Sequence, residues 1–286
     1  MSTFRKNLWR HAVAWILILF TFFPLYVVVM SSLDITGSLT TNSLFPSAMG
    51  FDNFKMLFVT PEGATPIPFM TWVKNSLVLA TASSVLSVFI GAAAAYAFSR
   101  LRFKGRKLGI QTLLLIQVFP SFLALAAIYV IMGEIYKVFP AFGLGSTGGL
   151  LLIYLGGAMG INAWLLKGFI DSIPAELDES ARIDGATPSQ VYWLIFFPLA
   201  APVLAVVALL SFVGTFNEFV LASLFFTEPE TRTVAVGLQQ FVGSKFTQNW
   251  GPFTAGSILA SVPLVTIFLS AQKYIVGGLT AGSVKG

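Results

Sequence analysis

The residues that could carry chemistry are few, and their types exclude most catalytic and metal sites. The chain has no cysteine and a single histidine, His11, which excludes disulfides, thiolate metal sites and a nucleophile–histidine–acid set. No G-x-x-x-x-G-K-S/T phosphate loop occurs, so a nucleotide that drives the protein must be bound by another chain. We therefore expect no catalytic residue, no metal and no cofactor on this chain.

Charged side chains gather instead in residues 173–198, between two hydrophobic blocks of the second half. Apolar residues recur every four positions at Ile173, Leu177 and Ala181, which predicts a short helix with one apolar stripe. Asp178 lies off that stripe, and its spacing from Arg182 predicts an ion pair between positions i and i+4.

A helix stop and a helix start follow each other inside this stretch. Gly185 stands where a left-handed C-cap ends a helix. Thr187 then predicts an N-cap, with Pro188 in the first turn and Gln190 closing a capping box. The stretch therefore predicts two helices joined by a tight turn.

Composition places this stretch in a membrane protein. Of the 286 residues, 56% are hydrophobic and 10% charged, whereas about a quarter are charged in soluble domains. Six uncharged blocks approach the roughly 20 residues that a membrane-spanning helix needs, and their continuous apolarity favours helices over a barrel. The predicted spans cover about residues 12–32, 75–99, 108–132, 150–170, 198–225 and 250–272. We expect an all-α integral membrane protein in which residues 1–286 form a single transmembrane domain.

The distribution of lysine and arginine predicts the orientation of the spans. Most of the 17 basic residues fall on one side if the N-terminus is cytoplasmic, which places both termini and the loop 173–198 inside. The basic run 100–107 is then a topology signal, and no nucleic-acid partner is expected. The first span is longer than a signal-peptide core and is expected to be retained.

The spacing of Glu179-Ser180-Ala181, Gly185 and Ile195-x-x-Pro198 resembles the EAA loop of permease subunits in binding-protein-dependent ABC importers, E-A-A-x3-G-x9-I-x-L-P. Ser180 and Phe197 depart from the pattern but keep a small and an apolar side chain. The resemblance implies that the loop docks into a groove on an ATPase subunit. From the residues alone, an ordinary amphipathic helix on the membrane surface remains the alternative. The ATPase-coupling residues implied are Glu179, Ser180, Ala181, Gly185, Ile195 and Pro198.

Most of the chain is similar to the MalG-type permease subunits of maltose and maltooligosaccharide ABC importers. The similarity is carried by AYAFSRLRFKG, AVGLQQ and the C-terminal GLTAGSVKG. It implies a type I ABC importer permease fold of six transmembrane helices in the cytoplasmic membrane of a prokaryote, importing a malto-oligosaccharide or other oligosaccharide. The partners implied are a second permease subunit of the MalF type, two ATPase subunits that bind ATP and Mg, and an extracytoplasmic solute-binding protein.

The same resemblance assigns two contact segments. The C-terminal tail is Gly-rich and on composition alone predicts a frayed end, but the resemblance implies contact with the ATPases. The last outer loop is implied to touch the binding protein, with a plain solvated connection as the alternative. The tail residues are Ser283, Val284, Lys285 and Gly286, and the loop residues are Gly243, Ser244, Lys245, Gln248 and Asn249.

Glu218, beside Asn217, is the most informative charge near an apolar run. A carboxylate there should face a cavity, a pore or a partner helix. Either both residues line a translocation path, or Glu218 anchors two helices to one another or lies at headgroup level.

Two local expectations concern the outer segments. Asp52 predicts the cap of a short helix with Phe54, Leu57 and Phe58 on its apolar face. Residues 233–237 lean toward β structure.

Three rival functions remain open. The chain could be an ABC permease for another solute, or an ion-coupled secondary carrier, although only Glu218 could serve ion coupling. An intramembrane enzyme is disfavoured because the catalytic sets are missing.

Overall fold

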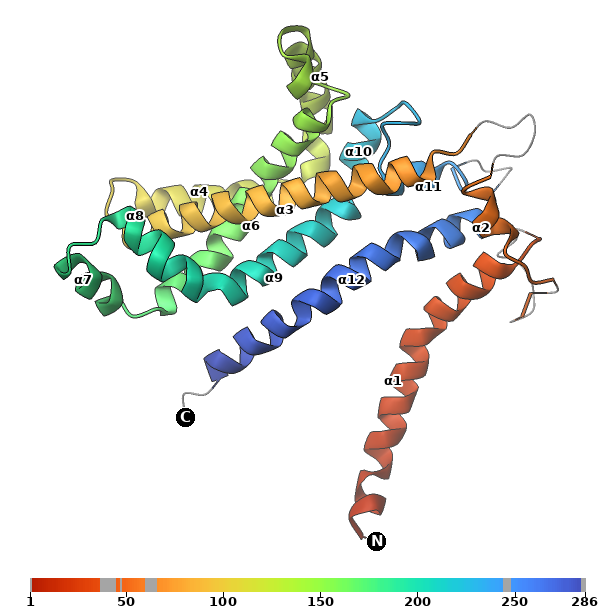
Figure 1. The fold of residues 1–286 in the computed structure, drawn as a ribbon, viewed down its shortest axis with the longest axis horizontal. Helices are drawn as coiled ribbons and strands as arrows, with labels where there is room; N and C mark the ends of the chain where they lie inside the picture. Colours follow the sequence, from red (N-terminus) through yellow and green to blue (C-terminus); the bar gives the residue numbers. More distant parts are fainter. Residues whose placement is uncertain (1, 37–44, 47, 60–65, 244–247, 284–286) are drawn as a thin grey trace. The chain divides into compact units, whose positions relative to one another are not determined.

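The described residues of the computed structural model are 2–36, 45–46, 48–59, 66–243 and 248–283, with side chains for all of these but 2–7, 121 and 273–283. This part of the chain is helical, with one isolated bridge between Asp34 and Met49, which confirms the predicted all-α class (Figure 1). The α-helices are α1 (Ser2–Leu33), α2 (Asp52–Met56), α3 (Phe69–Arg100), α4 (Arg106–Val118), α5 (Leu125–Val138), α6 (Thr147–Ser172), α7 (Glu176–Ile183), α8 (Pro188–Gln190), α9 (Phe197–Phe216), α10 (Val220–Phe225), α11 (Val234–Gln239) and α12 (Trp250–Ser283).

Within the described residues, 5 helices are long and apolar enough to cross a membrane, or up to 6 if one bent pair counts as a single span. They are Leu8–Leu33, Phe69–Arg100, Thr147–Ser172, Pro188–Phe216 and Trp250–Gln272, and the bent pair is Arg106–Val118 with Phe122–Val138. The helices thus have the length and composition of an integral membrane protein.

The bent pair differs from the straight span predicted over residues 108–132. The two helices of the pair meet at 83°, because Pro120 forces the preceding Phe119 out of the helical region, to φ −69° and ψ 126°. A short 3-10 turn over Ser121–Ala124 then leads into α5.

The fifth predicted span, 198–225, is also interrupted. Helix α9 ends at Phe216, and α10 begins only at Val220. The residues between them include Glu218, whose side chain bonds to the backbone of the next helix.

The chain divides by its contacts into two compact units, Met1–Thr71 with Val236–Val262 and Trp72–Ala235 with Pro263–Gly286. In the first unit, the buried Asn53 donates to the carbonyls of Ser32 and Asp34 at 3.0 and 2.8 Å, which holds α2 in place. The predicted Asp52 cap is wrong: the N-cap residue of α2 is Phe51, without a side-chain bond.

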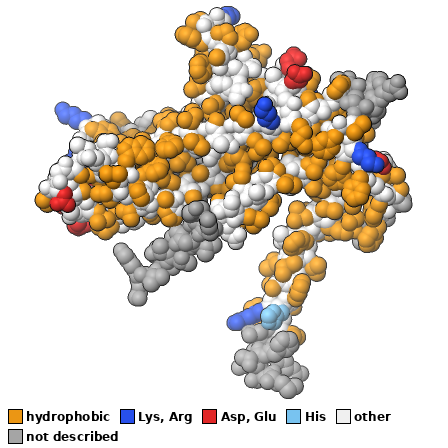
Figure 2. Space-filling model, in the orientation of Figure 1, with side chains coloured by type: hydrophobic (Ala, Val, Ile, Leu, Met, Phe, Trp, Pro, Cys, Tyr) orange, Lys and Arg blue, Asp and Glu red, His pale blue; other side chains and the backbone are white. Residues whose placement is uncertain are grey.

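In the second unit, α6 packs against α4 and α9, and these helices run beside α3 (Figure 1). Two hydroxyl contacts join α3 to α9: Ser84 donates to the Ala208 carbonyl at 2.6 Å, and Thr215 donates to Ser83 at 3.1 Å. Hydrophobic side chains cover most of the face seen in Figure 2, as expected where the surrounding solvent is lipid.

Residues 233–237 are helical from Val234 onward, so the expected β structure there is wrong. The backbone N–H of Val234 donates to the Ser76 hydroxyl at 2.8 Å, which satisfies one free donor at the start of α11. Tertiary contact with α3 therefore overrides a weak β propensity.

Candidate functional site

The turn between α7 and α8 has the geometry that its sequence predicts. Gly185 adopts a left-handed φ of +88°, its N–H donates to Arg182, and the N–H of Ala186 donates back to Ala181 at 2.9 Å. This pair of hydrogen bonds is a Schellman motif, which provides donors for carbonyls at the end of α7 that lack a partner within the helix. The predicted glycine stop is confirmed.

The capping box that starts the second helix is confirmed as well. The Thr187 N–H donates to the Gln190 side chain at 2.8 Å, and the Gln190 N–H donates to the Thr187 hydroxyl at 3.3 Å. Directly after α8 the chain widens into a π-helix over Val191–Phe196 before α9. Such wide turns are rare and frequently occur at functional sites, and this one contains the motif residue Ile195.

Asp178 does not form the predicted ion pair with Arg182. Its carboxylate lies 2.9 Å from Nε of Arg100, the last residue of α3, and the two side chains are 9% and 12% exposed. The predicted apolar stripe is right at Ala181, which is buried, and at Ile173, which packs against the same core cluster. It is wrong at Leu177, which is 44% exposed while Asp178 is buried. Breaking one partner of a buried pair costs about 3–5 kcal/mol, so this contact matters to the position of α7.

Arg100 also binds the end of α6. Its Nη2 donates at 2.7 Å to the carbonyl of Ile173, the C-cap residue of α6, and at 3.1 Å to that of Ile170, which also accepts the Ile173 N–H. One guanidinium therefore joins the ends of α3 and α6 to the start of α7. From the sequence alone, a basic residue at the end of an apolar run indicates only the orientation of the span. It does not reveal which residues the side chain contacts.

A second polar contact lies beside the first. The Ser99 hydroxyl donates to Asp171 at 2.5 Å, and Lys167 pairs with the other carboxylate oxygen at 2.5 Å. Arg106, at the start of α4, donates to the carbonyls of Phe98 and Ser99 at 2.5 and 2.8 Å. The ends of α3, α4 and α6 are thus bonded to one another.

Some residues of the EAA-like motif are buried against the neighbouring helices, and others lie on the surface of the loop. Ala181 is buried and Ile195 half-buried in an apolar cluster with Tyr96, Tyr192 and Phe196, whereas Ile183 is 86% exposed on the outer side of α7. Acidic side chains gather over α7 in the view of Figure 2. The loop offers a mixed polar and apolar face outward while its inner side is fixed. The motif residues on the exposed side are Glu179, Ser180, Gly185 and Pro198.

A cavity of about 890 Å³ lies between the α4–α5 bend, α6, α9 and α10. This volume is within the range of roughly 300–1,000 Å³ that small-molecule sites occupy. The rings of Phe119 and Phe122 form part of its wall, and Gly156 and Gly157 leave room that a side chain would fill. Its polar lining residues are Ser83, Gln117, Tyr154, Ser211, Thr215 and Glu218.

Glu218 faces this cavity and is bonded on both carboxylate oxygens. It accepts from the Tyr154 hydroxyl at 2.6 Å and from the backbone N–H groups of Leu221 and Ala222 at 2.8 and 3.0 Å. The carboxylate thus starts α10 and ties it to α6. Asn217 turns away, and its amide donates to the Val213 carbonyl at 2.9 Å.

Two further polar residues of the cavity, Tyr154 and Gln117, could not be identified from the sequence. Tyr154 bonds to Glu218, and the Gln117 amide donates to the Gly157 carbonyl at 2.7 Å. Both residues lie within hydrophobic runs of the sequence, where neither carries a charge or a motif that would single it out.

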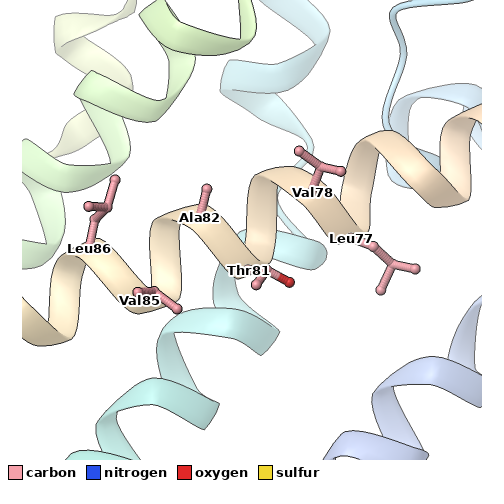
Figure 3. A pocket seen from close by; sticks show the side chains of 6 residues that line it. All are labelled: Leu77, Val78, Thr81, Ala82, Val85 and Leu86. Carbon is pink, nitrogen blue, oxygen red and sulfur yellow. The ribbon is translucent and has the colours of Figure 1, made fainter.

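A second hollow, of about 540 Å³, follows one face of α3, as Figure 3 shows. All of its lining side chains come from that helix, and Thr81 alone among them carries a polar group: Leu77, Val78, Thr81, Ala82, Val85 and Leu86. A polyhydroxylated solute would find a single hydroxyl there, whereas the larger cavity offers six polar side chains. The larger cavity is therefore the candidate solute site.

The outer loop is bonded to α3 before its predicted contact residues begin. The Trp72 indole donates to the Pro229 carbonyl at 2.6 Å, and the Asn75 amide donates to the Glu230 and Arg232 carbonyls at 2.9 and 3.0 Å. These bonds hold the loop's first half against the helix. No sequence pattern marks them, because the acceptors are backbone carbonyls.

The predicted contact segments lie partly outside the described residues. Gly243 donates to the Gln239 carbonyl at 2.7 Å, and Asn249 donates to the Phe241 carbonyl at 2.7 Å, while Gln248 is exposed. Helix α12 runs to Ser283. Outside the described residues lie Ser244, Lys245, Val284, Lys285 and Gly286.

Comparisons with known proteins identify this architecture. The model of the family "Binding-protein-dependent transport system inner membrane component" matches residues 87–280. The chain is 38% identical to the maltose/maltodextrin transport system permease protein MalG of Vibrio vulnificus (strain YJ016) over 298 residues, covering 100% of this chain and 98% of that protein.

Two solved structures share the fold. A bacterial ABC transporter involved in import of the acidic polysaccharide alginate matches with a TM-score of 0.73 and 21% identity, covering 96% of this chain and 98% of that one. The bacterial alginate ABC transporter in complex with its pentasaccharide-bound periplasmic protein matches with a TM-score of 0.68 and 20% identity, covering 94% of each chain. These matches confirm the predicted permease fold.

The family match also confirms the predicted membrane location and the assignment to a transport subunit rather than an ATPase. The region 173–198, singled out by its resemblance to the EAA loop, lies inside the matched residues. The chain belongs to the family of inner membrane components of binding-protein-dependent transport systems.

Proposed function

We propose that this chain is the permease subunit of an ATP-driven importer that carries a malto-oligosaccharide or another oligosaccharide. The observation that carries the proposal is the 38% identity with a maltose/maltodextrin permease along the entire chain. The cavity supports it chemically, because sugars present hydroxyls to polar groups and apolar ring faces to aromatic ones. Glu218, Tyr154 and Gln117 supply the polar groups, and Phe119 and Phe122 the rings.

In this proposal Glu218 contacts the passing sugar while it also holds α10 to α6. Oε2 of its carboxylate already accepts two bonds and Oε1 accepts one, so Oε1 can accept one more from the sugar. Asn217 flanks the path and positions the break in the helix rather than touching the sugar, because its amide is turned toward Val213.

Energy comes from two ATPase subunits, which bind ATP and Mg. The loop 173–198 docks on them through Glu179, Ser180 and the exposed Ile183, and their closure shifts the permease between inward- and outward-facing states. The tail Ser283–Gly286 reaches the same subunits. Residues 1–286 act as one transmembrane domain paired with a second permease subunit of the MalF type.

A solute-binding protein delivers the sugar at the outer face. Gly243, Ser244, Lys245, Gln248 and Asn249 are the proposed contact residues. The first half of the same outer loop is held to α3 by the Trp72 and Asn75 bonds, which limits the movement of the backbone that leads to them.

Isolation of the intact complex from membranes, followed by ATPase assays with its binding protein and a panel of oligosaccharides, tests the proposal. We expect stimulation by maltose or maltodextrins and little by unrelated solutes. Stimulation by a non-sugar solute alone would instead support the alternative, a permease of this family for another solute. An ion-coupled carrier has no support from the family that the chain matches.

A further inference from the structure

Arg100 occupies an unusual position among the charged residues that the structure describes. Its Nε lies 2.9 Å from Asp178 on α7, and its Nη2 donates to Ile173 and Ile170 at the end of α6. Because Arg100 is itself the last residue of α3, its side chain joins three helices at one point.

Three other ion pairs lie among the described residues, and each of them joins two residues of one helix. Lys137–Glu134 and Lys55–Asp52 each join residues three apart along one helix, with side chains about two-thirds exposed. Such pairs contribute little to position, since water competes for both partners. The Arg100–Asp178 pair is largely buried and connects two elements that are far apart in the sequence.

Apart from the ion pair with Arg100, few apolar contacts hold α7 against the rest of its unit. Ala181 is buried, but Leu177 and Ile183 are 44% and 86% exposed. One small side chain cannot fix the angle of a helix of 8 residues, whereas a planar guanidinium that is ion-paired with Asp178 and donates to two backbone carbonyls can.

We propose that Arg100 is a positioning residue that transmits movement between α7 and the membrane helices. The guanidinium holds α7 at a fixed angle to the ends of α3 and α6, so a displacement of α7 moves both helices together. The neighbouring hydrogen bond from Ser99 to Asp171, at 2.5 Å, keeps the ends of α3 and α6 together when α7 is displaced. This inference rests on the proposed docking of the loop 173–198 on the ATPases.

The test uses the assembled complex with its ATPases and binding protein, in membranes. The readout is sugar transported per ATP hydrolysed, measured beside the yield of assembled complex. The variants are Asp178→Asn, Arg100→Lys and the double variant Arg100→Met with Asp178→Met. Glu134→Gln, which removes a carboxylate from an exposed pair, is the matched control.

Asp178→Asn leaves the Arg100 charge buried without its partner, so we expect a lower yield of complex. The double variant leaves no unpaired charge at this site and should assemble near the wild-type yield. Its transport per ATP should nevertheless fall about tenfold or more, because two flexible methionines do not fix an angle. The control should match the wild type in both measurements.

A wild-type ratio of transport to hydrolysis in the double variant would overturn the proposal and leave the pair a purely structural role. Arg100→Lys keeps the test decisive if the double variant does not assemble. Lysine retains the positive charge but lacks the planar guanidinium with its several donors. The sugar transported per ATP hydrolysed by Arg100→Lys should therefore fall several-fold, and an unchanged value would also overturn the proposal.

Gly185→Val in the same assay separates the role of Arg100 from the docking of the loop. Normal coupling in Gly185→Val refutes the docking of the loop on the ATPases. A loss of coupling there, together with normal coupling in the double and lysine variants, refutes only the role of Arg100.

Discussion

At the scale of single residues, the half-buried Glu218 and the buried Asp178 matter because their carboxylates bind groups on other helices. Glu218 accepts three bonds and Asp178 pairs with Arg100, so each joins separate helices. The sequence could mark Glu218 as informative because a charge near an apolar run is costly. It could not identify Tyr154 or Arg100 as partners, since both contacts connect residues that are far apart along the chain.

Substitutions of Glu218 separate its two roles. Glu218→Gln keeps one acceptor oxygen and should leave assembly near normal while changing the rate of sugar uptake. Glu218→Leu removes all three accepted bonds and should cause loss of assembled complex, because each bond to a charged group contributes about 1.5–3 kcal/mol. The measurements are complex yield and uptake by membrane vesicles. Wild-type behaviour of both variants would show that neither role exists.

Tyr154→Phe tests the tie between α6 and the break before α10. The ring remains, but the donor to Glu218 is lost, and we expect a free energy of unfolding lower by about 1–3 kcal/mol with assembly retained. Tyr136→Phe is the control, since that side chain is 53% exposed on α5. Equal melting curves for the two variants would contradict the importance of the bond.

At the scale of elements, the loop 173–198 shows where sequence reasoning succeeds. The turn depends on local chemistry, so Gly185, Thr187 and Gln190 could be assigned correctly from their neighbours. The face that α7 buries depends on Arg100 from another helix, and there the predicted stripe is wrong at Leu177. The break in the third span could have been predicted from Pro120, but its 83° angle could not.

Gly185→Val should disturb the loop through its backbone alone. A Cβ at this position meets nothing within 4 Å, so the cost is that of a left-handed φ, about 1–2 kcal/mol. We expect normal insertion with loss of sugar-stimulated ATP hydrolysis. Gly133→Val is the control, because a Cβ there is equally free and φ is not positive. Normal stimulation in Gly185→Val would remove the loop from the coupling path.

The C-terminal end of α12 provides a second element-scale prediction. Deleting Ser283–Gly286 should leave the paired permease subunits intact and reduce the coupling of ATP hydrolysis to transport. Crosslinks from position 284 to the ATPases should change with the bound nucleotide. The chain has no native cysteine, so a single introduced thiol gives a clean signal. Full transport by the shortened chain, without any crosslink, would identify the tail as a dispensable end.

At the scale of the whole molecule, composition and charge distribution are enough to establish the class. A chain with 10% charged residues and continuous apolar runs has few options besides membrane helices. The cavity could not be predicted, because its wall combines residues from separate segments: the α4–α5 bend, the break before α10, and glycines of α6 and α9. The molecule as a whole is proposed to let ATP hydrolysis on other chains move a sugar through the membrane.

Uptake of labelled maltotriose by vesicles that contain the complete complex tests this proposed transport most directly. We predict uptake that requires ATP, the ATPase subunits and the binding protein, and that persists when ionophores collapse the ion gradients. Uptake by this chain and its paired permease without ATPases, or uptake abolished by ionophores while ATP remains, would contradict ATP-driven import.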